Sequence, residues 1–242
     1  MAQLFEEEKK YPDNAARANF VFLAYPFTPA ISQDDYNAVV KELQSEYPLR
    51  LWYFLDEVTT QELMRKIWRA VLRADLCIFD ISKGNPNVAF ELGLAAAIGK
   101  PCITLLKTGE PNPLGAADLG YSERAEYTSR ETLKAKLKQL LNAKSSALRL
   151  FYDISYAMQR DAFNDTREED EQNLTEIVKH VFQHKKINKP KARTIVGDDK
   201  RATGALNALR DANVLQVEGV KKGATWVFTD KWAYHDHEVV GA

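Results

Sequence analysis

Continuous apolar runs alternate with segments of helical apolar spacing through the first part of the chain. The runs are typical of strands covered on both faces of a parallel sheet, and they span residues 20–24, 49–55, 76–79 and 101–106. Segments with an apolar residue every three or four positions favour helices at residues 36–47, 63–71, 87–99 and 133–141. This alternation predicts the α/β fold class, with a parallel sheet. Ligands of such sheets bind at the carboxyl ends of the strands, where Tyr25, Asp56 and Asp80 lie.

The last part of the chain has a different pattern. Three amphipathic helices are predicted near residues 174–181, 190–196 and 199–213, followed by a hairpin from residues 214–218 and 224–228. Three helices and a β-wing resemble a winged helix, whose third helix usually enters the major groove of DNA. We therefore expect a winged-helix domain that contacts either nucleic acid or protein. The candidate nucleic-acid-binding residues are Lys200, Arg201, Arg210, Lys221 and Lys222.

Charge marks the boundary between the two parts. Residues 174–232 contain 12 Lys and Arg against 6 Asp and Glu, a local charge of +6, so a chain total of −1 leaves −7 for the remainder. An acidic stretch at residues 165–171 precedes the basic part. We expect an N-terminal extension at residues 1–18 and an α/β domain at residues 19–145. A helical and acidic linker at residues 146–172 then leads to a winged-helix-like domain at residues 173–235 and a tail at residues 236–242.

The composition excludes several classes of protein. With 242 residues, 45% of them hydrophobic, the chain can form a globular core, which excludes wholesale disorder. No apolar run approaches the roughly 20 residues that a membrane-spanning helix needs, and the polar start lacks the features of a signal peptide. Cys77 and Cys102 lie in apolar runs, as is typical of buried thiols in a reducing compartment. We expect a cytoplasmic protein with no membrane partner.

The segment 80–93, DISKGNPNVAFELG, carries the strongest chemical signal. Asn85 can cap a helix whose first residue is Pro86, and a helix start favours a nearby phosphate or carboxylate. The helix that follows is apolar all round, which predicts burial on every side, and Glu91 is its only charge. Glu91 is either a structural glutamate, hydrogen-bonded to a neighbouring strand or to Lys100, or a carboxylate placed in a cleft for function.

The longer pattern D-x-S-x-x-N-P-N-V-x-F-E-L-G-x-A-x-A-x-G-K-P resembles the motif of the nucleoside 2-deoxyribosyltransferase-like superfamily and of bacterial TIR-like nucleotide-binding proteins. The resemblance covers residues 19–142, including the first strand with Tyr25 and a later region around Asp118. It implies a small doubly wound parallel sheet in a flavodoxin-like strand order, which holds a nucleoside or nucleotide at the strand ends. It also implies that Glu91 is the catalytic glutamate, which attacks the anomeric carbon of the sugar and displaces the base. Asn85 stands where the transferases often have an aspartate that contacts the base. The family also suggests a bacterial setting with a role in defence.

The residues fit this chemistry. A carboxylate against the sugar face can form a glycosyl ester that water then cleaves, and a cationic nicotinamide leaves without a general acid. We expect the ribosyl–base bond of NAD or a (deoxy)nucleotide to be the substrate, with no further cofactor. The candidate substrate-binding residues are Tyr25, Asp80, Asn85, Asn87 and Asp118. Asp80, Asn85 and Asn87 have equally simple structural interpretations, as a strand-end cap, an N-cap and a residue of the first helical turn. For Tyr25 and Asp118 the structural interpretation is the commoner case: a buried tyrosine at a strand end and a residue that forms a turn.

Two alternatives complete the hypotheses. The pocket can instead sense a nucleotide without cleaving it and switch a winged helix bound to DNA or protein, or it can be degenerate in a protein that serves only for interaction. His180 and His184 have the spacing of two metal ligands, but nothing near them in the sequence completes a site, so no metal is expected. We also expect the protein to form a homo-oligomer.

Overall fold

The chain forms two compact units, divided between Ser145 and Ser146. The computed structural model describes residues 16–26, 30–53, 61–114, 122–159, 167–219, 224–229 and 232. Every helix in this part of the chain is too short or too polar to cross a lipid bilayer.

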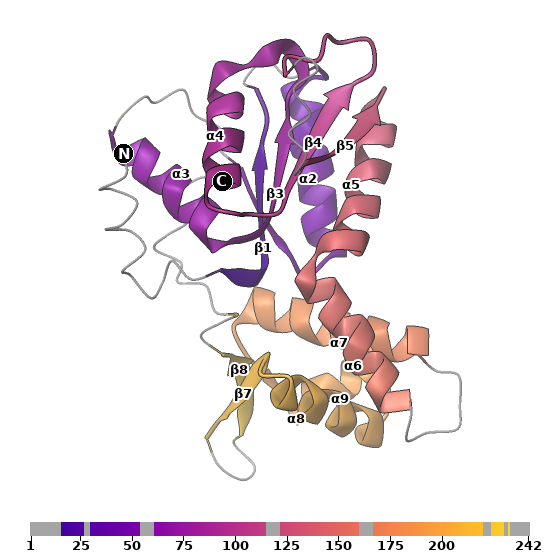
Figure 1. Cartoon of the computed structure of the whole chain (residues 1–242). Helices are drawn as coiled ribbons and strands as arrows, with labels where there is room; N and C mark the ends of the chain where they lie inside the picture. The colour runs from indigo at the N-terminus through magenta and orange to yellow at the C-terminus, as the bar shows by residue number, and fades with distance from the viewer. Residues whose placement is uncertain are drawn as a thin grey trace. The chain divides into compact units, whose positions relative to one another are not determined.

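The first unit is built on a five-stranded sheet in the order β2-β1-β3-β4-β5, in which all neighbouring strands are parallel. The strands are β1 (Arg17–Ala24), β2 (Arg50–Trp52), β3 (Ala74–Asp80), β4 (Cys102–Lys107) and β5 (Ser122–Tyr127). Because the strands are parallel, all their carboxyl ends lie at one edge of the sheet, toward which the arrows point in Figure 1. The α/β fold class with a parallel sheet is therefore confirmed.

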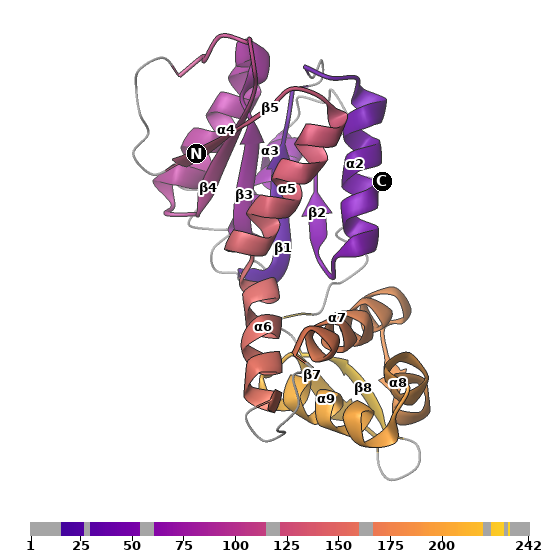
Figure 2. The same cartoon turned by 90° about the vertical axis from the view of Figure 1, so that its right-hand side faces the viewer.

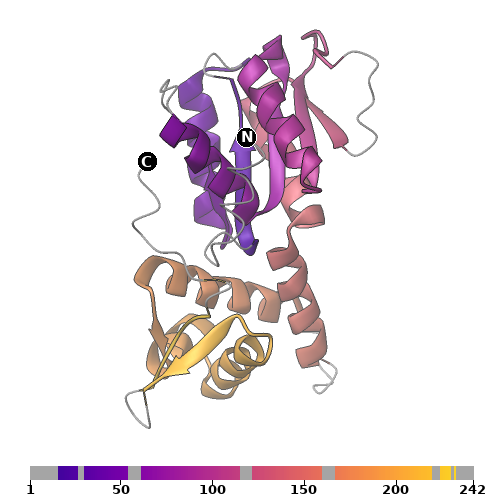
Figure 3. The same ribbon diagram turned by 60° about the vertical axis from the view of Figure 1, so that its left-hand side comes forward.

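Helices cover both faces of this sheet. Figure 2 shows α2 (Gln33–Glu46) and α5 (Arg130–Lys144) over one face, and Figure 3 shows α3 (Gln61–Arg73) and α4 (Pro86–Ala97) over the other. The central strands β1 and β3 are consequently buried on both sides, which explains their continuous apolar sequences.

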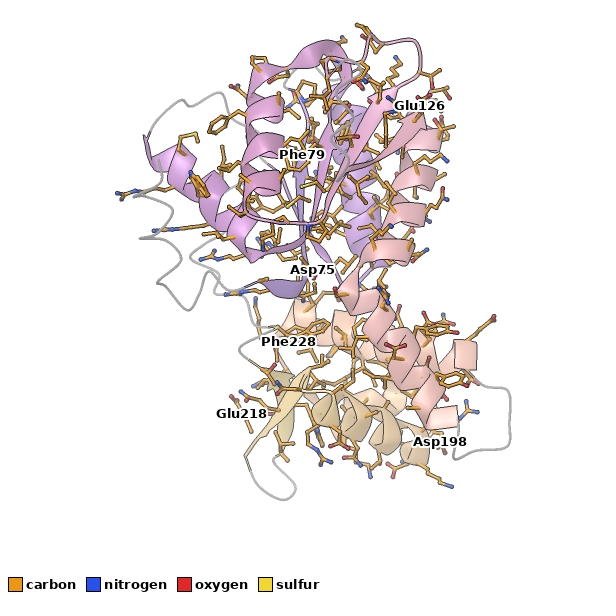
Figure 4. All side chains as sticks on the ribbon, viewed as in Figure 1. Asp75, Phe79, Glu126, Asp198, Glu218 and Phe228 are labelled. Carbon is orange, nitrogen blue, oxygen red and sulfur yellow. The ribbon has the colours of Figure 1, made fainter. Side chains whose placement is uncertain are left out.

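Strand β5 was not visible in the apolar pattern, because its sequence SERAEY is mostly polar. It pairs with β4 over six residues at the edge of the sheet, where polar side chains remain in contact with water. Asp75, near the amino end of β3, and Glu126, near the carboxyl end of β5, lie toward opposite edges of the sheet (Figure 4).

The prediction that the helix around Glu91 is buried all round is wrong. Helix α4 packs Val88, Leu92 and Ala95 against the rest of the unit, but its opposite face is exposed to solvent. That exposed face contains Ala89, Phe90, Gly93 and Ala97. Only one face of α4 packs against the sheet. The residues on the other face are small or apolar, yet the described chain leaves them exposed to solvent.

The second unit follows the order α6 (Ser146–Gln159), α7 (Arg167–His184), β6 (Ile187–Asn188), α8 (Lys189–Val196), α9 (Asp199–Asp211), β7 (Leu215–Glu218) and β8 (Thr225–Phe228). Its three strands form an antiparallel sheet in the order β6-β8-β7. The segment 146–172, where we expected a helical and acidic linker, contains α6 and the start of α7. Phe151 of α6 is buried against Trp232, with 5.7 Å between the ring centroids, so α6 belongs to the core of this unit.

Candidate functional site

The carboxyl edge of the parallel sheet brings together the ends of β1 and β3 and the starts of two helices. Helix α2 begins at this edge after β1, and α4 begins there after β3 (Figure 1). These helices lie on opposite faces of the sheet, so β1 and β3 flank the point at which the chain changes direction. Ligands of open α/β sheets bind at such a point.

Asp80 ends β3 and is completely buried. Its Oδ1 accepts a hydrogen bond from the Ser82 amide at 3.0 Å, and its Oδ2 accepts one from the Tyr127 hydroxyl at 2.6 Å. Burial raises the pKa of the Asp80 carboxyl, and the hydrogen bonds from Ser82 and Tyr127 oppose that shift. Asp80 therefore ties β3 to β5 and to the loop before α4, and both of its oxygens have partners within the protein.

Tyr36, at the start of α2, is a second buried polar group beside Asp80. Its hydroxyl makes no hydrogen bond of ordinary geometry to the described residues, but it lies close enough to the Asp80 carboxyl to oppose the raised pKa of that group. Burial, followed by the nearby Asp80 charge, raises the pKa of Tyr36 well above its usual value. Tyr36 and Asp80 therefore place two buried polar side chains beneath the edge where β1 and β3 end.

The loop between β3 and α4 is tightly held. Ser82 is buried, and its hydroxyl accepts a hydrogen bond from the Lys107 amide at 2.8 Å. Lys83 (φ 63°) and Gly84 (φ 62°) both adopt the left-handed region, which is unusual for a lysine. A side chain at Gly84 would come within 3.2 Å of the Pro113 Cβ, so a larger residue here would add a tight contact to an unfavourable backbone conformation.

Asn85 is the N-cap of α4, as predicted. Its Oδ1 accepts hydrogen bonds from the amides of Asn87 at 2.9 Å and Val88 at 3.3 Å. This side chain oxygen satisfies two of the amides that a helix start leaves free. Asn87 is exposed, one turn before Glu91 on the same helix.

Glu91 is partly buried in α4 and has no hydrogen-bond or ion-pair partner among the described residues. Burial alone raises the pKa of Glu91 to about 7. Lys100, the alternative structural partner, instead donates from Nζ to the carbonyl oxygens of Leu72 at 2.5 Å and Ala74 at 2.7 Å. Glu91 is therefore a titratable carboxylate with no contact among the described residues that explains its charge.

Tyr25 follows β1 and is half-buried in an aromatic cluster. Its ring stacks on Tyr36 with 4.1 Å between centroids, and its hydroxyl donates to Oδ1 of Asn37 at 2.8 Å. Tyr53, after β2, lies 5.9 Å from Tyr25 between centroids. Burial raises the pKa of both Tyr25 and Tyr53, so their hydroxyls stay protonated.

Sequence reasoning missed Tyr36, Tyr53, Tyr127 and Lys107 as residues of this edge. Tyr53 lies within a predicted strand, and its place near a strand end was the only available signal. Tyr127 is 47 residues from its partner Asp80, and no local pattern joins them. Asp118 lies outside the described residues, so its position at this edge stays a prediction.

The basic residues of the second unit have different surroundings. Lys200 is exposed, but Arg201 is ion-paired with Glu169 of α7, and Arg210 binds Asp211 at 2.8 Å. Lys221 and Lys222 lie outside the described residues. The His180 and His184 rings are 4.3 Å apart between centroids, and the described part of the chain contains no cluster of three or more side chains that could hold a metal ion.

Comparison of the sequence with protein-family models and with curated proteins finds no match. The functional argument therefore depends on the motif of residues 80–101 and on the geometry of the residues around it.

Proposed function

We propose that the first unit is an N-glycosidase that cleaves the ribosyl–base bond of NAD or a (deoxy)nucleotide, with Glu91 as the nucleophile. The observation that carries this proposal is the Glu91 carboxylate itself, which has no partner in the described chain and a pKa raised to about 7. It lies five residues after Pro86, about 7.5 Å along the axis of a helix that starts at the ligand-binding edge of the sheet. A buried, unpaired carboxylate near such an edge is typical of a catalytic group.

The chemistry follows from the carboxylate. Glu91 attacks C1′ of the sugar, the bond from C1′ to the base nitrogen breaks, and its electron pair leaves with the base. A water molecule then attacks C1′ of the glycosyl ester, restores the carboxylate and releases a proton to solvent. For a nicotinamide nucleotide the leaving base is neutral once the bond breaks, so no residue has to protonate it.

The surrounding residues take different roles in this proposal. Tyr25 and Asn87 are partly or fully exposed and remain candidates for substrate contact. The hydrogen bonds of Asp80 and Asn85 favour the structural alternatives, in which Asp80 caps the strand end and Asn85 caps the helix. Both would then act by positioning the loop before α4.

The finer fold assignments belong to the same proposal. The strand order β2-β1-β3-β4-β5 supports a flavodoxin-like sheet. The order α7-β6-α8-α9-β7-β8, with an antiparallel sheet, supports a winged helix in the second unit.

Base release from NAD and from deoxynucleotides, followed by chromatography, tests the enzymatic proposal. Wild type is expected to release base, and Glu91→Gln is expected to lose that activity because an amide cannot form the glycosyl ester. Glu126→Gln is the matched control, since Glu126 is an exposed carboxylate at the same edge of the sheet and pairs only with Arg124 among the described residues. No release by wild type above the level of Glu91→Gln would refute the proposal.

A nucleotide sensor coupled to the winged helix is the second candidate function. The exposed Lys200 on α9 favours a nucleic-acid contact, whereas the ion pairs of Arg201 and Arg210 reduce the positive charge available for phosphates. A gel shift with and without nucleotide separates the candidates, because DNA binding that changes while the nucleotide stays intact indicates a sensor.

A further inference from the structure

Lys107 reaches across the carboxyl edge of the sheet. It is the last residue of β4, yet its Nζ donates to the carbonyl oxygen of Ala30, in the connection between β1 and α2, at 2.6 Å. Strand β3 lies between β1 and β4 in the sheet, so the Lys107 side chain must extend over the carboxyl end of β3. Its ammonium therefore lies beside the point between β1 and β3 where ligands of this class of sheet bind.

The backbone of Lys107 is fixed on both sides. Its amide donates to the Ser82 hydroxyl in the loop that leads to α4, and Lys107 is the partner of Tyr127 in the register of β4 and β5. The side chain is only partly buried. An ammonium has three N–H groups, and the bond to Ala30 uses one of them, so two have no partner among the described residues.

Charged residues of both signs lie close to Lys107. Lys83, in the loop next to Ser82, is a second exposed cation. The buried Asp80 carboxylate already accepts hydrogen bonds from Ser82 and Tyr127. Glu110, in the turn after β4, and Glu126, near the end of β5, are carboxylates of the same edge, so it is the position of the Lys107 ammonium, and not the net charge, that favours an anionic ligand.

The start of α4 supplies fewer donors than its sequence suggests. The Asn85 side chain already accepts hydrogen bonds from the amides of Asn87 and Val88. A phosphate at this edge therefore depends more on side chain cations than on helix amides, and Lys107 is the cation whose position is fixed by the sheet.

We propose that Lys107 binds the phosphate of the substrate, so that the site takes nucleotides in preference to nucleosides. This inference rests on the proposed function for the identity of the ligand as a ribosyl–base compound. The Lys107 ammonium forms a charge-assisted hydrogen bond with a phosphate oxygen, using its free N–H groups. Its contact with Ala30 also joins the β1–α2 connection to the bound ligand.

Matched ligand pairs test this inference without relying on catalysis. Calorimetry on the full chain carrying Glu91→Gln measures the affinity for nicotinamide mononucleotide against nicotinamide riboside, and for deoxyadenosine monophosphate against deoxyadenosine. We expect Lys107→Met to weaken binding of each phosphorylated ligand roughly 10- to 100-fold, and to change binding of the nucleosides by less than about twofold. Lys107→Arg keeps the charge and is expected to retain most of the phosphate preference.

Lys138→Met is the matched control. Lys138 is a partly exposed lysine of α5 that pairs with Glu46 at the far end of α2, so its loss removes the same charge away from the carboxyl edge. The control is expected to leave all four affinities unchanged. The affinity for nucleosides also serves as an internal check that Lys107→Met remains folded.

Several results would overturn the inference. It is wrong if the parent protein binds none of the four ligands, if it does not prefer the phosphorylated ligands, or if Lys107→Met weakens both members of a pair equally. The proposed function is tested separately by base release. If the protein releases base but does not prefer phosphorylated ligands, the proposed enzyme activity stands and the role of Lys107 is refuted. If the protein prefers phosphorylated ligands through Lys107 but releases no base, the ligand site stands and the catalytic role of Glu91 is refuted.

Discussion

Removal of one hydroxyl, in Tyr127→Phe, is expected to destabilise the first unit in a way that depends on pH. Tyr127 is 1% exposed, and its hydroxyl lies 2.6 Å from Oδ2 of the completely buried Asp80. A hydrogen bond to a charged group contributes about 1.5–3 kcal/mol, and the variant leaves one carboxylate oxygen unsatisfied. We expect the free energy of unfolding to fall by about 2–3 kcal/mol where Asp80 is ionised, and by about 1 kcal/mol where it is protonated.

The direction of the pH effect follows from proton linkage. Burial raises the pKa of Asp80, and the bond from Tyr127 lowers it, so Tyr127→Phe raises the pKa of Asp80 further in the folded state. The folded variant then binds a proton more tightly than the unfolded chain, and its stability declines more steeply than that of wild type as pH rises. Urea unfolding followed by circular dichroism at pH 5 and pH 8 measures this difference.

Tyr47→Phe is the control for this experiment, because Tyr47 belongs to the same unit and its hydroxyl has no hydrogen bond within the described residues. It is expected to change stability by less than about 0.5 kcal/mol at either pH. An equal loss for Tyr127→Phe at both pH values would refute the role given to the Asp80–Tyr127 bond.

Three further predictions concern other residues. The pKa of Glu91 is about 7 in the folded chain and near 4.5 otherwise, so Glu91 contributes stability below pH 4.5 that is lost as pH rises through 7. Glu91→Gln is therefore expected to exceed wild type in urea unfolding by about 2–3 kcal/mol more at pH 8 than at pH 5, and equal differences would contradict this. Base release by wild type is expected to increase with pH to a plateau above about 7, and a rate that is flat from pH 5 to pH 8 would argue against an ionising Glu91. Phe151→Ala is expected to destabilise the second unit by about 3–5 kcal/mol, measured by thermal unfolding, since Phe151 is 1% exposed against Trp232.

The sequence pattern predicted the centre of the sheet because burial on both faces requires unbroken apolar runs. Residues 76–79 lie within β3, and residues 20–24 form the end of β1. The polar edge strand β5 obeys no such requirement, so the apolar pattern did not reveal its six residues as a strand. The exposed face of α4 was missed for a related reason, since apolar composition indicates what a helix can bury and not how much of it a neighbour covers.

The candidate site was predicted where a strand end or a short motif marks its residues. The N-cap at Asn85 and the lone charge of Glu91 both follow from one short segment, and the structure bears out the cap. The bond from Lys107 to Ala30 joins residues 77 positions apart, and the bond from Tyr127 to Asp80 joins residues 47 apart. Such contacts depend on strand order, which local propensity does not determine.

A comparison of the two carboxylates on this side of the sheet shows why Glu91 is the better catalytic candidate. Asp80 is more deeply buried, but its carboxylate accepts hydrogen bonds from the Ser82 amide and the Tyr127 hydroxyl, so it has a structural role. Glu91 has no such donors among the described residues, and burial shifts its pKa to about 7. A glutamine of the same size would occupy that position in α4 without the cost of desolvating a charge. A residue that costs stability and gains no contact within the described chain is typical of a functional site, which supports the role proposed for Glu91.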